Sequence, residues 1–130
     1  MRLVDPANME LLLRSEIPQK PPSVNNYLKR GCGVVYKKRE ARQWQEDAAW
    51  IMRIDWGKKP PYEGRVYVEV LVYSLRPESF DADNRLKTAQ DAIQMAGVIR
   101  DDRQAARSAV EKIETAGEEK TVIEVWAWKD

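Results

Sequence analysis

The chain has 130 residues, of which 43% are hydrophobic and 33% charged, and it contains 5 Trp and 5 Tyr. This length suits one domain with a single core. The composition is too apolar for a disordered chain and too charged for a membrane protein. No apolar run approaches the roughly 18 residues that cross a bilayer, and the first residues lack the apolar region of a signal peptide. We therefore predict one cytoplasmic domain over residues 1–130, with no membrane contact.

The residue types present restrict the chemistry that the protein can perform. The sequence contains no His, which excludes His general bases, Ser-His-Asp triads and imidazole metal ligands. The lone Cys32 excludes an intramolecular disulfide and a zinc site built from several cysteines. Any catalysis must therefore use carboxylates, Lys, Tyr, Ser or a hard metal ion.

Charge is unevenly distributed along the chain, although the net charge is only +1. Residues 1–65 contain 13 Lys and Arg against 8 Asp and Glu, and residues 66–130 contain 9 against 13. A basic first half and an acidic second half fit a surface for a polyanion joined to a carboxylate cluster. A chance partition of charge is the alternative.

Hydrophobic periodicity predicts an α+β fold, with a small mixed or antiparallel sheet and two main helices. The predicted strands are Leu11–Ile17, Arg65–Leu75, Arg107–Ile113 and Thr121–Trp128. The predicted helices are about Glu40–Ile54 and Asp83–Ala96, ended by Gly57 and Gly97. Gly31–Tyr36 is predicted as a hairpin or mobile loop, and Thr115–Lys120 as a hairpin loop between the last two strands.

Each predicted helix has one apolar face. In the first helix the two tryptophans, Trp44 and Trp50, are assigned to the core. In the second helix the core side is formed by Leu86, Ala89, Ile93 and Ala96. The nearly opposite stripe carries Asn84, Lys87 and Asp91, and also Met95, a candidate interface residue.

An Asp-x-Asp pair lies where the second predicted strand leads into the second helix. Asp81 and Asp83 are two residues apart, and extended backbone at this corner places both side chains on one side. Two carboxylates about 4 Å apart repel by about 4 kcal/mol at a partly buried surface, so a proton or a cation must lie between them. Mg²⁺ suits this position because it prefers oxygen ligands and keeps water positions open for phosphates.

Two further residues extend this carboxylate pair. Asp102 follows the far end of the second helix and closes the site if folding brings it to Asp81 and Asp83. Lys87, one turn after Asp83, offsets charge in the transition state or on the leaving oxygen, while the metal activates water. The spacing leaves open a simpler interpretation, in which the acids only cap a helix and contribute about 1 kcal/mol or less each.

Three stretches of the sequence resemble the RusA family of Holliday-junction resolvases. They are Pro21–Tyr27 (PPSVNNY), Asp81–Lys87 (DADNRLK) with Asp91 after it, and Gly97–Gln104 (GVIRDDRQ). Their order and spacing match the family from about Leu11 to Trp128, and the combination of D-x-D-N-x-x-K with G-x-x-x-D-D-x-Q is specific. The resemblance implies a small α+β homodimer, of bacterial or phage origin, that cuts four-way DNA junctions with magnesium.

The resemblance also implies a role for each residue of the site. The metal-binding catalytic carboxylates are Asp81, Asp83 and Asp102. Lys87 matches the family's essential lysine. The positions that support the ligands through hydrogen bonds are Asn84, Asp91 and Asp101.

A basic and aromatic segment around the start of the first helix is the predicted DNA-contacting region. Cations interleaved with Tyr27 and Tyr36 suit phosphate contacts and base stacking, although a solvated face is the alternative. The resemblance implies that the Pro21–Tyr27 segment and the basic loop after it meet DNA. Arg76, the single basic residue immediately before the acidic motif, is added to this region. The predicted DNA-binding residues are therefore Ser23, Asn25, Asn26, Tyr27, Lys29, Arg30, Lys37, Lys38, Arg39 and Arg76.

Together these features predict a homodimeric endodeoxyribonuclease that uses Mg²⁺, with Mn²⁺ as a substitute. It is expected to resolve Holliday junctions in DNA recombination and repair by paired symmetric nicks. Three alternatives are a metal-dependent nuclease for flaps and forks, a non-catalytic DNA-binding module, and a small-molecule hydrolase that uses the same acids.

Overall fold

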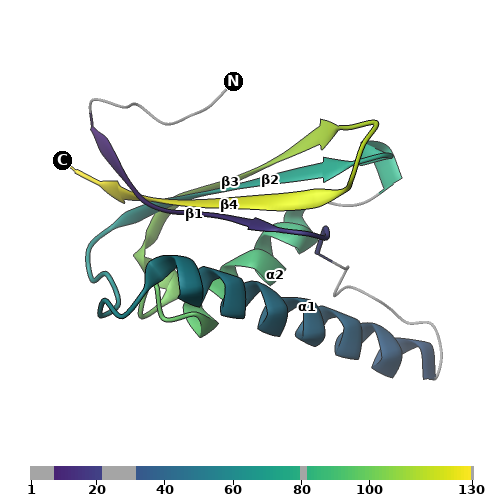
Figure 1. Ribbon diagram of the computed structural model, residues 1–130, viewed down its shortest axis with the longest axis horizontal. Helices are drawn as coiled ribbons and strands as arrows, with labels where there is room; N and C mark the ends of the chain where they lie inside the picture. Colours follow the sequence, from purple (N-terminus) through teal and green to yellow (C-terminus); the bar gives the residue numbers. More distant parts are fainter. Residues whose placement is uncertain (1–7, 22–31, 80–81, 130) are drawn as a thin grey trace.

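The computed structural model shows one mixed sheet with both α-helices packed on the same face (Figure 1). It describes residues 8–21, 32–79 and 82–129. The elements are β1 (Met9–Ile17), α1 (Cys32–Trp56), β2 (Val66–Ser74), η1 (Pro77–Ser79), α2 (Ala82–Met95), η2 (Asp102–Gln104), β3 (Ala105–Glu114) and β4 (Lys120–Trp128). The α+β class, the mixed sheet and the two main helices are confirmed. None of the helices in the described ranges is long and apolar enough to cross a membrane.

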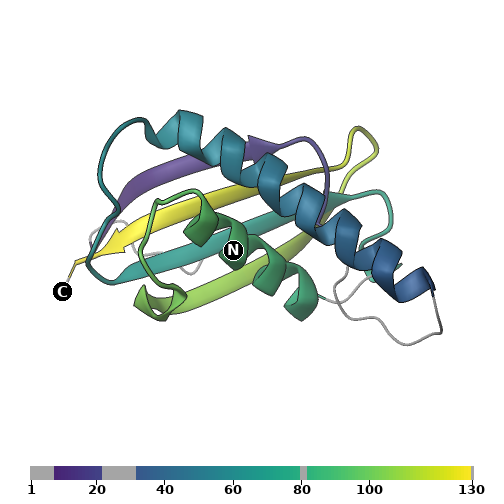
Figure 2. The same ribbon diagram turned by 90° about the horizontal axis from the view of Figure 1, so that it is seen from below.

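The strands are arranged in the order β1-β4-β2-β3. β2 and β3 are parallel, with Val66 opposite Ala105 and Ser74 opposite Glu114, whereas β4 is antiparallel to both β1 and β2. Parallel neighbours require a crossover connection, and α2 supplies it. α2 therefore starts beyond the carboxyl end of β2 and returns the chain to the amino end of β3 (Figure 2).

The predicted hairpin between β3 and β4 is wrong, because the two strands lie on opposite sides of β2. Their connection passes over the end of β2, where the Thr115 N–H donates to the Ser74 carbonyl at 3.0 Å. Burial explains the arrangement. β4 buries five consecutive residues, 121–125, as a central strand does, whereas β3 has no fully buried residue and forms an edge.

Two predictions for α1 also need correction. The helix begins at Cys32, so the hairpin or loop predicted at Gly31–Tyr36 is wrong from Cys32 onward; Gly31 lies outside the described residues. A glycine in a helix costs only about 1 kcal/mol, which the long helix-forming run after it offsets. Trp44 is 3% exposed, as predicted for a core residue, but Trp50 is 62% exposed because it lies on the opposite side of the helix.

The core holds α2 at a fixed position against the sheet. Alternate β2 residues, including Val68 and Val70, pack with Met52 of α1 and Ile93 of α2. Polar side chains add direct links at the margins of this core. The Gln90 carboxamide of α2 donates to the Ser108 hydroxyl of β3 at 2.6 Å, and Gln45 of α1 donates to the Thr88 carbonyl of α2 at 3.2 Å.

Gly97 ends α2 in the left-handed conformation, with φ +78°, and its N–H donates to the Gln94 carbonyl. A Cβ at this position meets no atom within 4 Å, so the cost of an added side chain comes from the backbone alone. We expect Gly97→Ala to lower the free energy of unfolding by about 1–2 kcal/mol in urea denaturation. Gly117→Ala is the matched control, since Gly117 is not at positive φ and an added Cβ there would lie 3.8 Å from its nearest neighbouring atom, the Thr115 Oγ1. Equal stability of the two variants would contradict this explanation.

Candidate active site

The second member of the Asp-x-Asp pair, Asp83, lies at the amino-terminal end of α2. Asp81 is outside the described residues, whereas Asp83 and Asn84 belong to the first turn of the helix, with side chains that are not described. Free backbone N–H groups and the helix dipole favour negative charge at such an end. A carboxylate pair and a phosphate ligand are both compatible with this location.

The predicted polar stripe of α2 is confirmed for its described side chains. Lys87 is exposed, and Asp91 is half-buried and accepts a long hydrogen bond of 3.5 Å from the Gln45 carboxamide. Gln94 and Met95, which is 42% exposed, continue the stripe toward the end of the helix. This surface runs between the two ends of α2, where the candidate carboxylates lie.

Asp101 has a structural task in the loop that follows α2. Its side chain caps η2 by accepting the Arg103 N–H at 2.9 Å, and it also binds the Arg103 guanidinium at 2.9–3.2 Å. These bonds lower the pKa of Asp101 to about 2, and the bonds from the Arg103 side chain have the largest effect. Because both its oxygens are engaged by Arg103, Asp101 fits the supporting role expected of it better than that of a metal ligand.

Gln104 fixes this loop to the rest of the fold, and the sequence analysis assigned it no role. Its side-chain oxygen accepts the N–H groups of Arg100 and Asp101 at 2.8 and 3.1 Å. Its amide nitrogen donates to the carbonyls of Tyr62 and Gly64 at 2.8 and 2.9 Å. A carboxamide offers two acceptor sites and two donors, so Gln104 uses its full capacity. Its place in the G-x-x-x-D-D-x-Q motif was the only signal in the sequence.

Asp102 is exposed and lies far from the start of α2 within one chain. α2 has 14 residues, which corresponds to about 21 Å of helix. The sheet gives an independent measure, because Asp102 immediately precedes β3 beside the start of β2, whereas α2 follows the end of β2. The nine residues of β2 span about 25 Å or more. Figure 2 shows η2 and the start of α2 at opposite ends of the helix.

Within the described part of one chain, the backbone positions of Asp83 and Asp102 are therefore about a helix length apart. Among the described residues, no group of three or more Asp, Glu or Cys side chains is placed to hold a metal ion. The donor chemistry nevertheless suits Mg²⁺, because carboxylates are the hard oxygen ligands it prefers.

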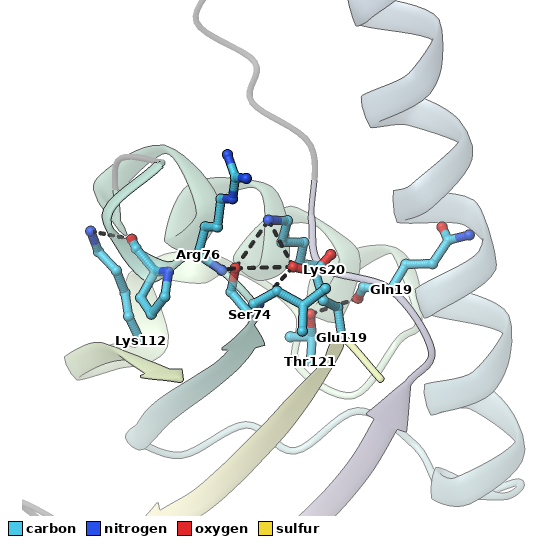
Figure 3. Close-up of polar contacts among 9 residues, drawn as sticks. Gln19, Lys20, Ser74, Arg76, Lys112, Glu119 and Thr121 are labelled. Atoms are coloured by element: carbon cyan, nitrogen blue, oxygen red, sulfur yellow. Dashed lines mark hydrogen bonds and ion pairs between the residues drawn. The ribbon is translucent and has the colours of Figure 1, made fainter. Parts of the chain in front are cut away.

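A network of polar side chains surrounds the end of β2, where the chain leaves toward the acidic motif (Figure 3). Lys20, Ser74 and Glu119 are bonded to one another, with distances of 3.1–3.2 Å. Lys112 of β3 donates to the Pro77 carbonyl of η1 at 3.0 Å. The sequence does not point to Lys20, Glu119 and Lys112, because only the sheet order brings these segments to one place.

The predicted DNA-binding residues are only partly within the described ranges. Arg39 on α1 is exposed, and so is Arg76, whose backbone N–H donates to the Ser74 hydroxyl at 3.1 Å. Lys37 and Lys38 lie in α1, but their side chains are not described. The remaining predicted residues lie outside the described ranges; they are Ser23, Asn25, Asn26, Tyr27, Lys29 and Arg30.

Comparison with known proteins identifies the family. The family model described as Endodeoxyribonuclease RusA matches residues 18–126, a range that includes the start of α2 and the η2 loop. The chain belongs to the RusA endodeoxyribonuclease family. A relative from Aquifex aeolicus (strain VF5), named Crossover junction endodeoxyribonuclease RusA, is 31% identical over 106 residues. This similarity covers 80% of this chain and 82% of the relative. The resemblance drawn from the motifs is confirmed.

Gln104→Glu tests how the η2 loop is held. The substitution keeps the size of the side chain but replaces its two donors with an oxygen that faces the Tyr62 and Gly64 carbonyls. We expect a loss of about 1–3 kcal/mol in the free energy of unfolding, because two acceptors lose their partner. Gln19→Glu is the control, since the Gln19 carboxamide is exposed and points away from the neighbouring network (Figure 3). A loss of stability as large in the control would argue against this account.

Proposed function

We propose that this family member is a magnesium-dependent endodeoxyribonuclease that resolves four-way DNA junctions. The observation that supports this proposal most is the family match, because the matched range, residues 18–126, includes both the Asp-x-Asp motif and the Asp102 loop. The name of the Aquifex aeolicus relative supports a crossover junction as the substrate. We place the activity in the cytoplasm of a bacterial or phage-infected cell, where recombining DNA is found.

The proposed enzyme is a homodimer whose metal site takes residues from both subunits. Asp102 is about 20 Å from the start of its own α2, so in this proposal the third carboxylate comes from a second copy. Two α2 helices that pack antiparallel about a two-fold axis place each Asp102 beside the partner's Asp81 and Asp83. Such an interface is isologous, and forming one site forms the other. The exposed surface of α2 with Lys87, Asp91 and Met95 is available for this contact.

Asp81, Asp83 and the Asp102 of a second copy are the proposed ligands of Mg²⁺, for which Mn²⁺ can substitute. When bound, the ion supplies an activated water and offsets charge on the phosphate oxygens. Lys87 is one turn after Asp83 on the exposed side of α2, where its ammonium group can approach a phosphate. Asn84, Asp91 and Asp101 are the proposed supporting residues, and Asp101 acts by shaping the loop that presents Asp102.

The proposed DNA surface joins the basic residues before and within the first turns of α1 to the end of β2. Arg39 and Arg76 are its described, exposed members. The other proposed members are Ser23, Asn25, Asn26, Tyr27, Lys29, Arg30, Lys37 and Lys38. Phosphate contacts by several cations release counterions, so junction affinity should fall steeply as salt increases.

The Asp83→Asn variant tests the proposed reaction. Loss of one ligand charge should abolish nicking of a four-way junction in Mg²⁺, while junction binding, measured by gel shift in Ca²⁺, is retained. Wild-type protein with a chelator in place of Mg²⁺ should also bind without cutting. Asp47→Asn, a change of the same kind on the exposed side of α1, is the control. Nicking by Asp83→Asn at the wild-type rate would show that this carboxylate takes no part in the reaction. Faster cutting of matched flaps or forks than of four-way junctions would show that the proposed substrate is wrong.

Mixing two inactive variants tests whether the site is shared between subunits. In a shared site, a dimer of Asp83→Asn with Asp102→Asn has one site in which both changes coincide and one that is wholly wild type. After subunit exchange at equal concentrations, half of the dimers are mixed, so we expect about a quarter of the wild-type nicking. Sites built within single chains give no recovery, because each chain then carries one damaged site. Each variant alone should remain inactive.

A further inference from the structure

Three segments that are distant in the sequence meet at the carboxylate of Glu119 (Figure 3). Its Oε2 accepts the Leu75 N–H at 2.8 Å, the Ser74 hydroxyl at 3.1 Å and the Lys20 ammonium at 3.2 Å. Leu75 belongs to the chain that leads from β2 to α2, Lys20 follows β1, and Glu119 lies in the connection between β3 and β4. The bond from the Leu75 N–H, together with those from Lys20 and Ser74, lowers the pKa of Glu119, so the group is charged at neutral pH.

Ser74 completes the junction between these segments. Its side chain is fully buried, and its hydroxyl accepts the Arg76 N–H and the Lys20 ammonium, both at 3.1 Å, while it donates to Glu119. A hydroxyl has one donor and two acceptor sites, so Ser74 has no capacity left. The backbone N–H groups of Leu75 and Arg76 are thus both bound by side chains at the first two positions after β2. This defines the path of the chain as it leaves the sheet toward Asp81.

We propose that Glu119, Ser74 and Lys20 form a positioning network for the carboxylates at the start of α2. The network acts through the backbone of Leu75 and Arg76, and none of its members is a ligand. Lys20 also precedes the Pro21–Tyr27 segment, whose proposed role is DNA contact. The network therefore fixes the position of the catalytic carboxylates relative to the start of the DNA-contacting segment. This inference rests on the proposed nuclease function.

The expected effects separate a positioning role from a merely structural one. The side chains of Glu119 and Lys20 are 30% and 25% exposed, and partly solvated ion pairs contribute about 1 kcal/mol or less to stability. Misplacement of catalytic groups by about 1 Å reduces rates by up to about 100-fold. Breaking the network should therefore change the reaction rate much more than the stability of the fold.

The test compares Glu119→Gln with Glu118→Gln, an identical change at the neighbouring exposed residue. In Glu119→Gln we expect nicking at saturating junction to slow by about tenfold or more, and more Mg²⁺ to be needed for half-maximal nicking. Junction affinity in Ca²⁺ and the thermal midpoint should stay close to those of Glu118→Gln. Amide hydrogen exchange should rise at Leu75 and Arg76, because their acceptors are weakened or displaced.

Ser74→Ala and Ser74→Thr provide a second, independent pair. The alanine variant removes the hydroxyl and should reproduce the slower nicking and the faster exchange at Arg76, whereas threonine keeps the hydroxyl and should restore both. Rates and exchange in Glu119→Gln that equal those of Glu118→Gln would overturn the proposal. The exchange measurement needs no catalysis, so it tests the network even if the wild-type protein does not cut junctions. Absence of wild-type nicking would instead overturn the proposed function.

Discussion

The parallel pairing of β2 with β3 is the constraint on which the arrangement of the candidate site depends. Two parallel neighbours need a connection that returns the chain to the starting edge of the sheet. In this protein α2 is that connection, and its core face is fixed by Ala89, Ala92 and Ile93, which are fully buried. Asp83 lies in the first turn of α2 and Asp102 follows the helix, so the fold separates these two residues by about the length of the helix.

At each end of α2, a polar side chain binds the backbone that leads into or out of the helix. Gln104 binds the backbone just before Asp102 and links it to the carbonyls of the segment that precedes β2, and Glu119 binds the backbone that leads toward Asp81. Both side chains occupy backbone donors or acceptors that irregular structure leaves without a secondary-structure partner. The apolar core positions α2 as a body, and these hydrogen bonds define where the chain enters and leaves it. Precise placement matters at such points, because carboxylates that share a cation tolerate little error in geometry.

Features that depend on local pattern were predictable from the sequence. β2 was recognised by alternation, α2 by its apolar face and the left-handed Gly97 by its place after the last helical turn. The pairing of β4 with β2 was not, because turn-forming residues after β3 suit either a hairpin or a connection across a strand end. The exposure of Trp50 was also missed, since residue type alone does not report the side of a helix. Likewise, spacing selects Asp81, Asp83 and Asp102, but Lys20 and Glu119 meet only through the order of the strands.

The separation of the carboxylates also bears on why a second copy belongs to the proposed enzyme. If each chain carried a complete site, a single chain could cut one strand without a partner. If the site is shared, the metal binds only in the dimer, where two sites are present together. Antiparallel packing of two α2 helices gives two sites at the two ends of one helix pair, separated by about 20 Å. Two symmetric sites that form together suit a substrate with two equivalent strands to cut.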